Sequence, residues 1–155
     1  MEIQSAGFSA DYKDGLNEPS HCEGANNPNN LGANMPWTYF QSTGKLCNRA
    51  DQCAATGYSG APAGKNNPAM QNVEKVGPIP RGGYMIEAPF NSPDHGPFAM
   101  HLVPDLANVM YGRDGFLMHG DSLEHPGAAS EGCIIMPRPA REAVWNSGEH
   151  RLLVA

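Results

Sequence analysis

The chain has 155 residues, of which 40% are hydrophobic, and a formal net charge of −6 at pH 7. This length accommodates one folded domain with a real core, but not two independent domains. The acidic balance excludes the electrostatic footprint of a protein that binds nucleic acid or an anionic membrane surface. No apolar run is long enough to span a bilayer, and the first residues lack the basic start and apolar core of a signal peptide. We therefore expect a soluble protein that is made in the cytoplasm.

Glycine and proline are frequent throughout the chain, with 18 and 14 residues respectively. Both residues interrupt long helices and favour short strands joined by turns. Residues 1–35 are rich in Asn, Gly, Pro and Ser and show no lasting periodicity, which predicts an irregular N-terminal arm. Residues 36–155 are expected to form the folded domain.

Strands are predicted wherever aromatic, β-branched or alternating apolar residues recur between turn residues. A long loop rich in Gly, Pro and Asn is predicted over 56–72, and a stiff Gly-Pro turn over 76–83. The predicted strands are 37–40, 45–47, 84–87, 98–103, 116–118, 133–136 and 151–154.

One short helix is predicted near the C-terminus. Pro137-Arg138-Pro139 is typical of a helix start, and Gly148 is typical of a helix end. Ala140, Ala143 and Val144 would form its apolar face. The fold class is therefore mainly β, a small sheet or barrel with one short helix.

The four cysteines are Cys22, Cys47, Cys53 and Cys133, and their spacing matches no zinc-finger pattern. One disulfide among the first three fits an oxidising compartment. Three unpaired thiols fit the sequence equally well, so both alternatives stay open.

The stretch 115–136 holds the residues most typical of chemistry. Its first apolar run predicts a buried strand that delivers His119 at its end, and its second predicts a strand that begins at Cys133. If these strands pair, the end of the first lies near the start of the second. The imidazole and the thiol would then be close enough to act as a nucleophilic pair.

The turn before the cysteine, Ser130-Glu131-Gly132, supports this interpretation. Small and polar residues favour a tight turn there, and the amides of Gly132 and Cys133 would form an oxyanion hole for an attacked acyl carbonyl. The thiolate is the attacking species, and the imidazole would take its proton. Either Asp121 or a backbone carbonyl would orient the ring of His119, and spacing does not decide between them.

Several segments together resemble one known family. His119-Gly120 followed by Ser130-Glu131-Gly132-Cys133-Ile134 looks like the signature of the L,D-transpeptidase catalytic domain, in which a histidine precedes a Ser/Thr-x-Gly-Cys segment. Across residues 36–136 the sequence resembles the branch of that superfamily found as type VI secretion effectors. The other segments that carry the resemblance are TGYSG at 56–60, VGPIPRG at 76–82 with Tyr84, and YGRD at 111–114 with Phe116.

The resemblance implies a β-sandwich fold and a cysteine enzyme, without cofactor or metal, that acts on peptidoglycan stem peptides. In that family the cysteine attacks the carbonyl of the L-centre of diaminopimelate, releases the terminal D-alanine and forms a thioester. Water then gives L,D-carboxypeptidase activity, and an amine gives transpeptidation or D-amino-acid exchange. Carried over to this chain, Cys133 is the nucleophile, His119 the base, the carbonyl of Gly120 the orienter of the ring, and Ser130 a supporting polar residue.

Two positions near the nucleophile depart from the better-known enzymes of the superfamily. Glu131 stands where they have His, and Ile135 stands where they have Arg. Arg113 and Arg138 are then the cations available for a substrate carboxylate, with Tyr84 as a further candidate substrate-binding residue.

The resemblance also implies partners and a destination. A secretion machine, through one of its components, would export the protein into the periplasm of a rival cell. A cognate immunity protein would protect the producing cell. Neither a nucleic acid nor a membrane is expected as a partner.

Two alternatives from other functional classes remain. A metal-binding protein would use His119, His125 and Cys133, although the gap between the histidines suits no common helical ligand pair. A non-catalytic secreted β domain would use Cys133 only for packing.

Overall fold

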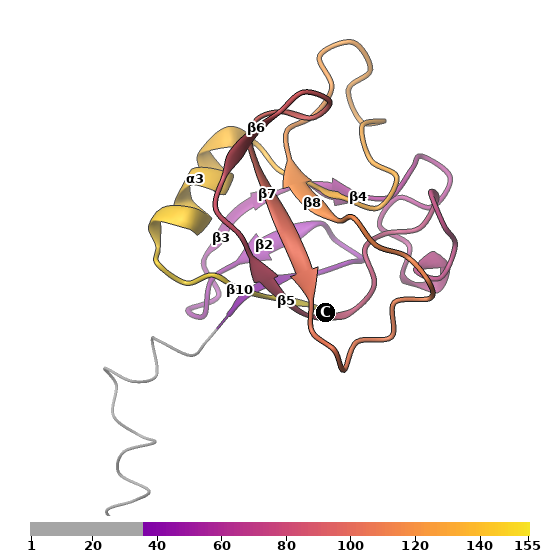
Figure 1. Ribbon diagram of the computed structural model, residues 1–155, viewed down its shortest axis with the longest axis horizontal. Coiled ribbons are helices and arrows are strands. Elements are labelled where there is room, and N and C mark those ends of the chain that lie inside the picture. Colours follow the sequence, from indigo (N-terminus) through magenta and orange to yellow (C-terminus); the bar gives the residue numbers. More distant parts are fainter. Residues whose placement is uncertain (1–35) are drawn as a thin grey trace, which may run out of the picture. The chain divides into compact units, whose positions relative to one another are not determined.

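The computed structural model describes residues 36–155, so the irregular arm expected at residues 1–35 lies outside the described residues. The described part is mainly β (Figure 1). It has ten strands, one α-helix and one short 3-10 helix. The predicted mainly β class with a single short helix is therefore confirmed. Within this part, no helix combines the length and apolar character that crossing a bilayer requires.

All seven predicted strands form, with ends shifted by up to two residues. Three further strands, β3, β4 and β6, were not predicted from the sequence. The helices are η1 (Pro68–Met70) and α3 (Arg138–Asn146). The strands are β1 (Trp37–Tyr39), β2 (Lys45–Cys47), β3 (Cys53–Thr56), β4 (Tyr58–Ser59), β5 (Gly82–Ile86), β6 (Phe90–Ser92), β7 (Gly96–Pro104), β8 (Leu117–His119), β9 (Ile134–Ile135) and β10 (Arg151–Val154).

The strands form one mixed sheet in the order β3-β2-β1-β10-β5-β7-β8-β9-β4, with β6 paired to β7. Only β1–β10 and β8–β9 pair in parallel. Apolar side chains from both ends of this path belong to a single core cluster, including Leu46 on β2 and Met118 on β8. The sheet therefore curls around its own core, and Figure 1 shows β2 and β3 behind the β5 and β7 strands.

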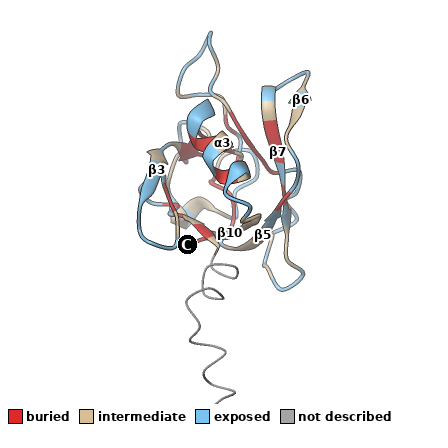
Figure 2. Cartoon of the chain, turned by 90° about the vertical axis from the view of Figure 1, so that its left-hand side faces the viewer, coloured by how far each residue is buried: buried red, intermediate tan, exposed pale blue. Residues whose placement is uncertain are grey.

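Helix α3 closes one side of this core and contacts β3, β7 and β8. Figure 2 shows its buried face turned toward the strands. Ala140 and Val144 are buried there as expected, but Ala143 is exposed and Arg141 takes its place on the buried face. The predicted apolar face was wrong at Ala143, because the register of α3 turns a charged residue inward.

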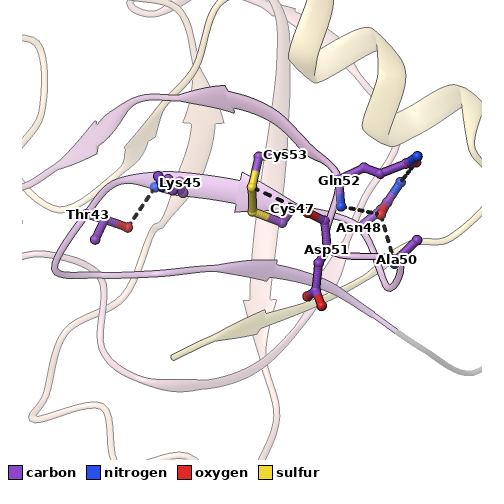
Figure 3. The surroundings of a disulfide bond; sticks show 8 residues. All are labelled: Thr43, Lys45, Cys47, Asn48, Ala50, Asp51, Gln52 and Cys53. Atoms are coloured by element: carbon purple, nitrogen blue, oxygen red, sulfur yellow. Dashed lines mark hydrogen bonds between the residues drawn. A yellow bond between two sulfur atoms is a disulfide. The ribbon is translucent and has the colours of Figure 1, made fainter.

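A disulfide joins Cys47 on β2 to Cys53 on β3, where the two residues face each other directly in the antiparallel pair. The side chain of Asn48 shapes the intervening turn by accepting from the amides of Ala50 and Gln52 (Figure 3). Of the alternatives left open by the sequence, the structure thus has one disulfide. Cys22 lies outside the described residues.

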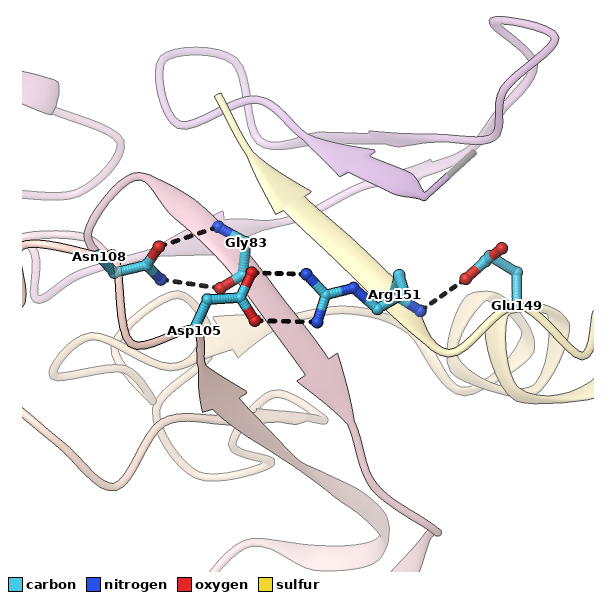
Figure 4. A network of polar contacts seen from close by, with 5 residues as sticks. All are labelled: Gly83, Asp105, Asn108, Glu149 and Arg151. Carbon is cyan, nitrogen blue, oxygen red and sulfur yellow. Dashed lines mark hydrogen bonds and ion pairs between the residues drawn. The ribbon is translucent and has the colours of Figure 1, made fainter. Parts of the chain in front are cut away.

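Polar contacts also fix the last strand. The guanidinium of Arg151 on β10 binds both carboxylate oxygens of Asp105, and the side-chain amide of Asn108 bonds the backbone of Gly83 on β5 (Figure 4). These contacts tie the loop after β7 to the edge of the β10–β5 pair. The opposite end of the domain carries the β6–β7 turn and the β8–β9 loop, as Figures 1 and 2 show.

Candidate active site

The nucleophile and base candidates lie on neighbouring strands. β8 ends at His119, and Cys133 immediately precedes β9. The strands run parallel, rather than as a hairpin, with His119 opposite Ile135. The amide of Leu117 donates to the sulfur of Cys133 at 3.3 Å, so the thiol sits two residues short of the histidine along the sheet.

Both residues line one cleft of about 1040 Å³. Its walls come from the β6–β7 turn, the segment before β8, the β8–β9 loop and one side chain of α3. The parallel pairing therefore places the imidazole and the thiol in the same cavity, although no hydrogen bond joins them in this part of the chain.

His119 is almost completely buried, with 2% of its surface exposed. Its Nδ1 lies 2.8 Å from the carbonyl oxygen of Gly120, so Nδ1 carries the proton and donates to that carbonyl. The lone pair is then on Nε2, which has no hydrogen-bond partner among the described residues. This is the tautomer in which a histidine accepts a proton from a nucleophile.

The electrostatics of the two groups favour their neutral forms. Burial lowers the pKa of His119 to about 4, with nearby His95 and Arg141 adding to the effect. Burial also raises the pKa of the Cys133 thiol, and the Glu131 charge raises it further. The Leu117 amide and the Arg113 charge act against this rise. The resting site therefore holds a thiol and a neutral imidazole, not a thiolate–imidazolium pair.

Ser130 anchors the turn that carries the cysteine. Its hydroxyl donates to the carbonyl of Cys133 and accepts from the amides of Gly132 and Gly60. The Gly132 amide is thus already engaged, whereas the Cys133 amide has no backbone acceptor among the described residues. Of the two expected oxyanion-hole donors, Cys133 is the uncommitted one.

Gly132 has no room for a side chain. A Cβ there would lie 2.5 Å from Nη2 of Arg113 and 2.9 Å from the ring of Phe116, and its φ of 142° is one that L side chains rarely adopt. The residue before Cys133 therefore has to be glycine.

The orienter of His119, left open by the sequence, is the carbonyl of Gly120 in this structure. Asp121 is occupied elsewhere, because it accepts from the hydroxyl of Tyr58 at 2.6 Å and from the amides of Ser122 and Gly127. Asp121 thereby shapes the β8–β9 loop at the mouth of the cleft.

The three candidate substrate-binding residues lie in different surroundings. Arg113 lines the cleft, but its two terminal nitrogens donate to four backbone carbonyls. Tyr84 is fully buried, donates to the carbonyl of Pro80 and does not line the cleft. Arg138 is on the exposed side of α3, paired with Glu142, and does not line it either.

Two cleft residues were not found by the sequence analysis. The ring of His95, from the β6–β7 turn, stacks on that of His119 with centroids 4.4 Å apart. Arg141, on α3, is 5% exposed and lines the cleft beside Gly120. A charged residue next to Ala140 on a helix with few apolar positions was the only sequence signal for Arg141, and no signal pointed to His95.

The described residues contain no group of three or more His, Cys, Asp or Glu side chains arranged to hold a metal ion. His125 is exposed in the β8–β9 loop and does not join His119 and Cys133 in such a group. The metal-binding alternative therefore has no support in this part of the chain.

Comparison with known proteins gives one match. The model of a family described as the Tlde1 domain matches residues 53–154, about two thirds of the chain, including every residue of the cleft. No curated protein and no solved structure matches the chain.

Proposed function

This chain belongs to the Tlde1 family of type VI secretion effectors, and we propose that it is a cysteine L,D-carboxypeptidase that trims peptidoglycan tetrapeptides to tripeptides. The same acyl-enzyme would give L,D-transpeptidase exchange when a D-amino acid takes the place of water. The observation that carries the proposal is the pair in the cleft. Cys133 faces the same cavity as a histidine whose Nδ1 is bonded to Gly120 and whose Nε2 is unpartnered.

The neutral resting state determines how the reaction starts. Because burial disfavours both charged forms, the proton leaves the thiol as the sulfur attacks, and Nε2 of His119 accepts it. The sulfur bonds to the carbonyl carbon at the L-centre of diaminopimelate, and the negative charge develops on the carbonyl oxygen. The amide of Cys133 is the donor available to that oxygen.

The tetrahedral intermediate then breaks the bond between carbon and nitrogen. His119 returns its proton to the leaving amine, D-alanine departs, and a thioester to Cys133 remains. Water, deprotonated by the again neutral His119, hydrolyses the thioester and regenerates the thiol. A D-amino acid would follow the same course with its amine as the nucleophile.

The supporting residues hold this geometry without touching the substrate. Ser130 and Ser59 anchor the cysteine turn, since the Ser59 hydroxyl donates to the carbonyl of Gly132 and accepts from the amide of Ile79. Family membership is consistent with secretion into a target cell and with an immunity protein as partner. We propose the periplasm as the compartment of action, because the peptidoglycan substrate lies there.

The test is mass spectrometry of purified muropeptides incubated with the protein. Loss of one alanine from tetrapeptides is expected, and added D-amino acid should appear at the same position. Cys133→Ala and His119→Ala are each expected to lower the rate at least about 10³-fold with the fold retained. His125→Ala, at an exposed histidine of the same cleft, is the matched control and should retain activity. Full activity of the Cys133→Ala protein would contradict the proposed nucleophile.

A further inference from the structure

We propose that Arg141 binds the terminal carboxylate of the substrate and so confines cleavage to the last residue of the peptide. This inference rests on the proposed carboxypeptidase function and adds the residue that selects its substrate.

The first observation is an incompletely used guanidinium. Nε of Arg141 donates to the carbonyl of Met136, and Nη1 donates to those of Pro97 and Phe98. Nη2 has no hydrogen-bond partner among the described residues, and no carboxylate of this part of the chain pairs with Arg141. Nη2 is not fully enclosed by protein atoms, so it is open to the cleft that Arg141 lines.

In a buried guanidinium, a donor without a hydrogen-bond partner is costly until an acceptor reaches it. The three bonds to carbonyls hold the guanidinium plane in place, so the unused Nη2 is already oriented. The N–H groups of arginine donate charge-assisted hydrogen bonds to carboxylates. With Nε and Nη1 committed, the arrangement fits one carboxylate oxygen on Nη2.

The second observation is the position of Nη2. It borders Gly120, since a Cβ built on that glycine would lie 2.9 Å from it, and the carbonyl of Gly120 holds the ring of His119. The free nitrogen is therefore on the base side of the cleft.

The chemistry requires the leaving residue on that side. His119 has to protonate the leaving amine, so the nitrogen of the terminal residue lies next to the imidazole. In a C-terminal amino acid the carboxylate carbon is attached to the same Cα as that nitrogen. The carboxylate is thus within reach of whatever cation stands beside the base, and that cation is Arg141.

The other cations of the cleft fit this role less well. Arg113 has both terminal nitrogens committed to backbone carbonyls. Lys75 is exposed, makes no side-chain hydrogen bond to residues 36–155 and is next to Glu74 in the sequence. Five acidic residues also line the cleft, so a carboxylate needs a fixed local cation to enter it. They are Glu74, Asp94, Asp114, Asp121 and Glu131.

The experiment compares two substrates that differ only in charge. They are the tetrapeptide stem with a free terminal carboxylate and the same peptide with a terminal primary amide. For the unmodified protein we expect kcat/KM to be about 30-fold higher for the acid, mainly through KM, as one charge-assisted contact provides. Arg141→Gln should reduce this ratio to about 3-fold or less by losing activity on the acid alone.

Two further variants keep the test decisive if Arg141→Gln fails to fold. In Gly120→Ala the added Cβ would lie 2.9 Å from Nη2, so the planar guanidinium has to shift away and the ratio should fall in a folded protein, whatever the change in overall rate. Arg151→Gln removes an arginine that does not line the cleft and pairs with Asp105 instead, so it should keep the full ratio. Circular dichroism and thermal melting establish the fold of each variant.

The outcomes separate the two proposals. If the unmodified protein trims neither peptide, the carboxypeptidase function itself fails. If it trims both equally well, the function stands and the role of Arg141 is overturned. A full acid-to-amide ratio in folded Arg141→Gln or Gly120→Ala protein also overturns that role.

Discussion

Two buried arginines lie beside the segments that carry His119 and Cys133, and their guanidinium groups are used differently. Arg113, beside Gly132, donates from both terminal nitrogens to backbone carbonyls of the 71–78 segment and of Glu131. Arg141, beside Gly120, donates from Nε and Nη1 to backbone carbonyls and has Nη2 available to the cleft. Both line the same cavity and both are about equally buried. Burial of a charge therefore does not identify a binding residue, whereas an uncommitted donor that faces a cavity does.

Arg113→Gln tests the structural side of this comparison and has the largest expected effect. The substitution leaves several buried carbonyls without a donor, so we expect the free energy of unfolding to fall by about 4 kcal/mol. Urea denaturation followed by circular dichroism measures this. A loss below about 1 kcal/mol would contradict the structural role assigned to Arg113.

The Cys47–Cys53 disulfide lies outside the cleft lining and provides a control for the effect of stability alone. Replacing Cys47 and Cys53 together by serine removes a short loop closure, which is expected to cost about 2 kcal/mol of stability. Neither residue lines the cleft, so kcat/KM at 25 °C and the acid-to-amide ratio should stay unchanged. A changed ratio would mean that loss of stability alone alters carboxylate selection.

His95→Ala tests how the wall around the base sets its proton affinity. In the unmodified protein the imidazole of His119, with its pKa lowered to about 4, is protonated and inactive only at acid pH. Removing the stacked ring opens His119 to water and removes a second histidine charge, while Arg141 and Asp121 remain nearby. The acid limb of the profile of kcat/KM against pH should therefore move up by about one pH unit.

The matched control for His95→Ala is His125→Ala, which removes a cleft histidine that does not stack on the base. Its acid limb should coincide with that of the unmodified protein. Equal profiles for all three proteins would exclude any influence of His95 on His119.

Arg138→Gln has the smallest expected effect and completes the comparison with an exposed arginine. Its partner Glu142 lies four residues further along the same helix, and the ion pair is open to water. Stability should therefore change by less than about 0.5 kcal/mol. KM for the tetrapeptide should stay within about twofold, because Arg138 does not line the cleft. A tenfold rise in KM would restore Arg138 as the carboxylate-binding residue that the sequence suggested.

The strands that the sequence predicted are those with enough residues to show alternation or a β-branched run. β7 and β10 are examples, with buried and exposed positions alternating along much of each strand. β4 has two residues inside a Gly- and Pro-rich segment and is a strand only because it pairs with β9. β6 pairs with β7 through an irregular register. Such strands are created by tertiary pairing, which local sequence does not encode.

The same distinction holds for the site. Cys133 and His119 could be selected as candidates from the sequence because a turn, a strand end and a family resemblance coincide in one short stretch. The direction of pairing between β8 and β9 could not be predicted, since strands of three and two residues are equally compatible with both directions. Arg141 and His95 reach the cleft from distant elements, and only the curled sheet brings them to it.

The hydroxyl of Ser130 has a consequence for hydrogen exchange. The amide of Gly60 donates to it from the segment after β4, and the amide of Gly132 donates to it within the cysteine turn, so exchange of either amide requires a buried hydrogen bond to break. We expect both amides to be among the most protected in the domain, whereas Leu123, with its side chain almost fully exposed at the tip of the β8–β9 loop, should exchange quickly. Such protection would mean that the turn carrying Cys133 is ordered before any peptide binds, whereas the tip of the β8–β9 loop opens readily.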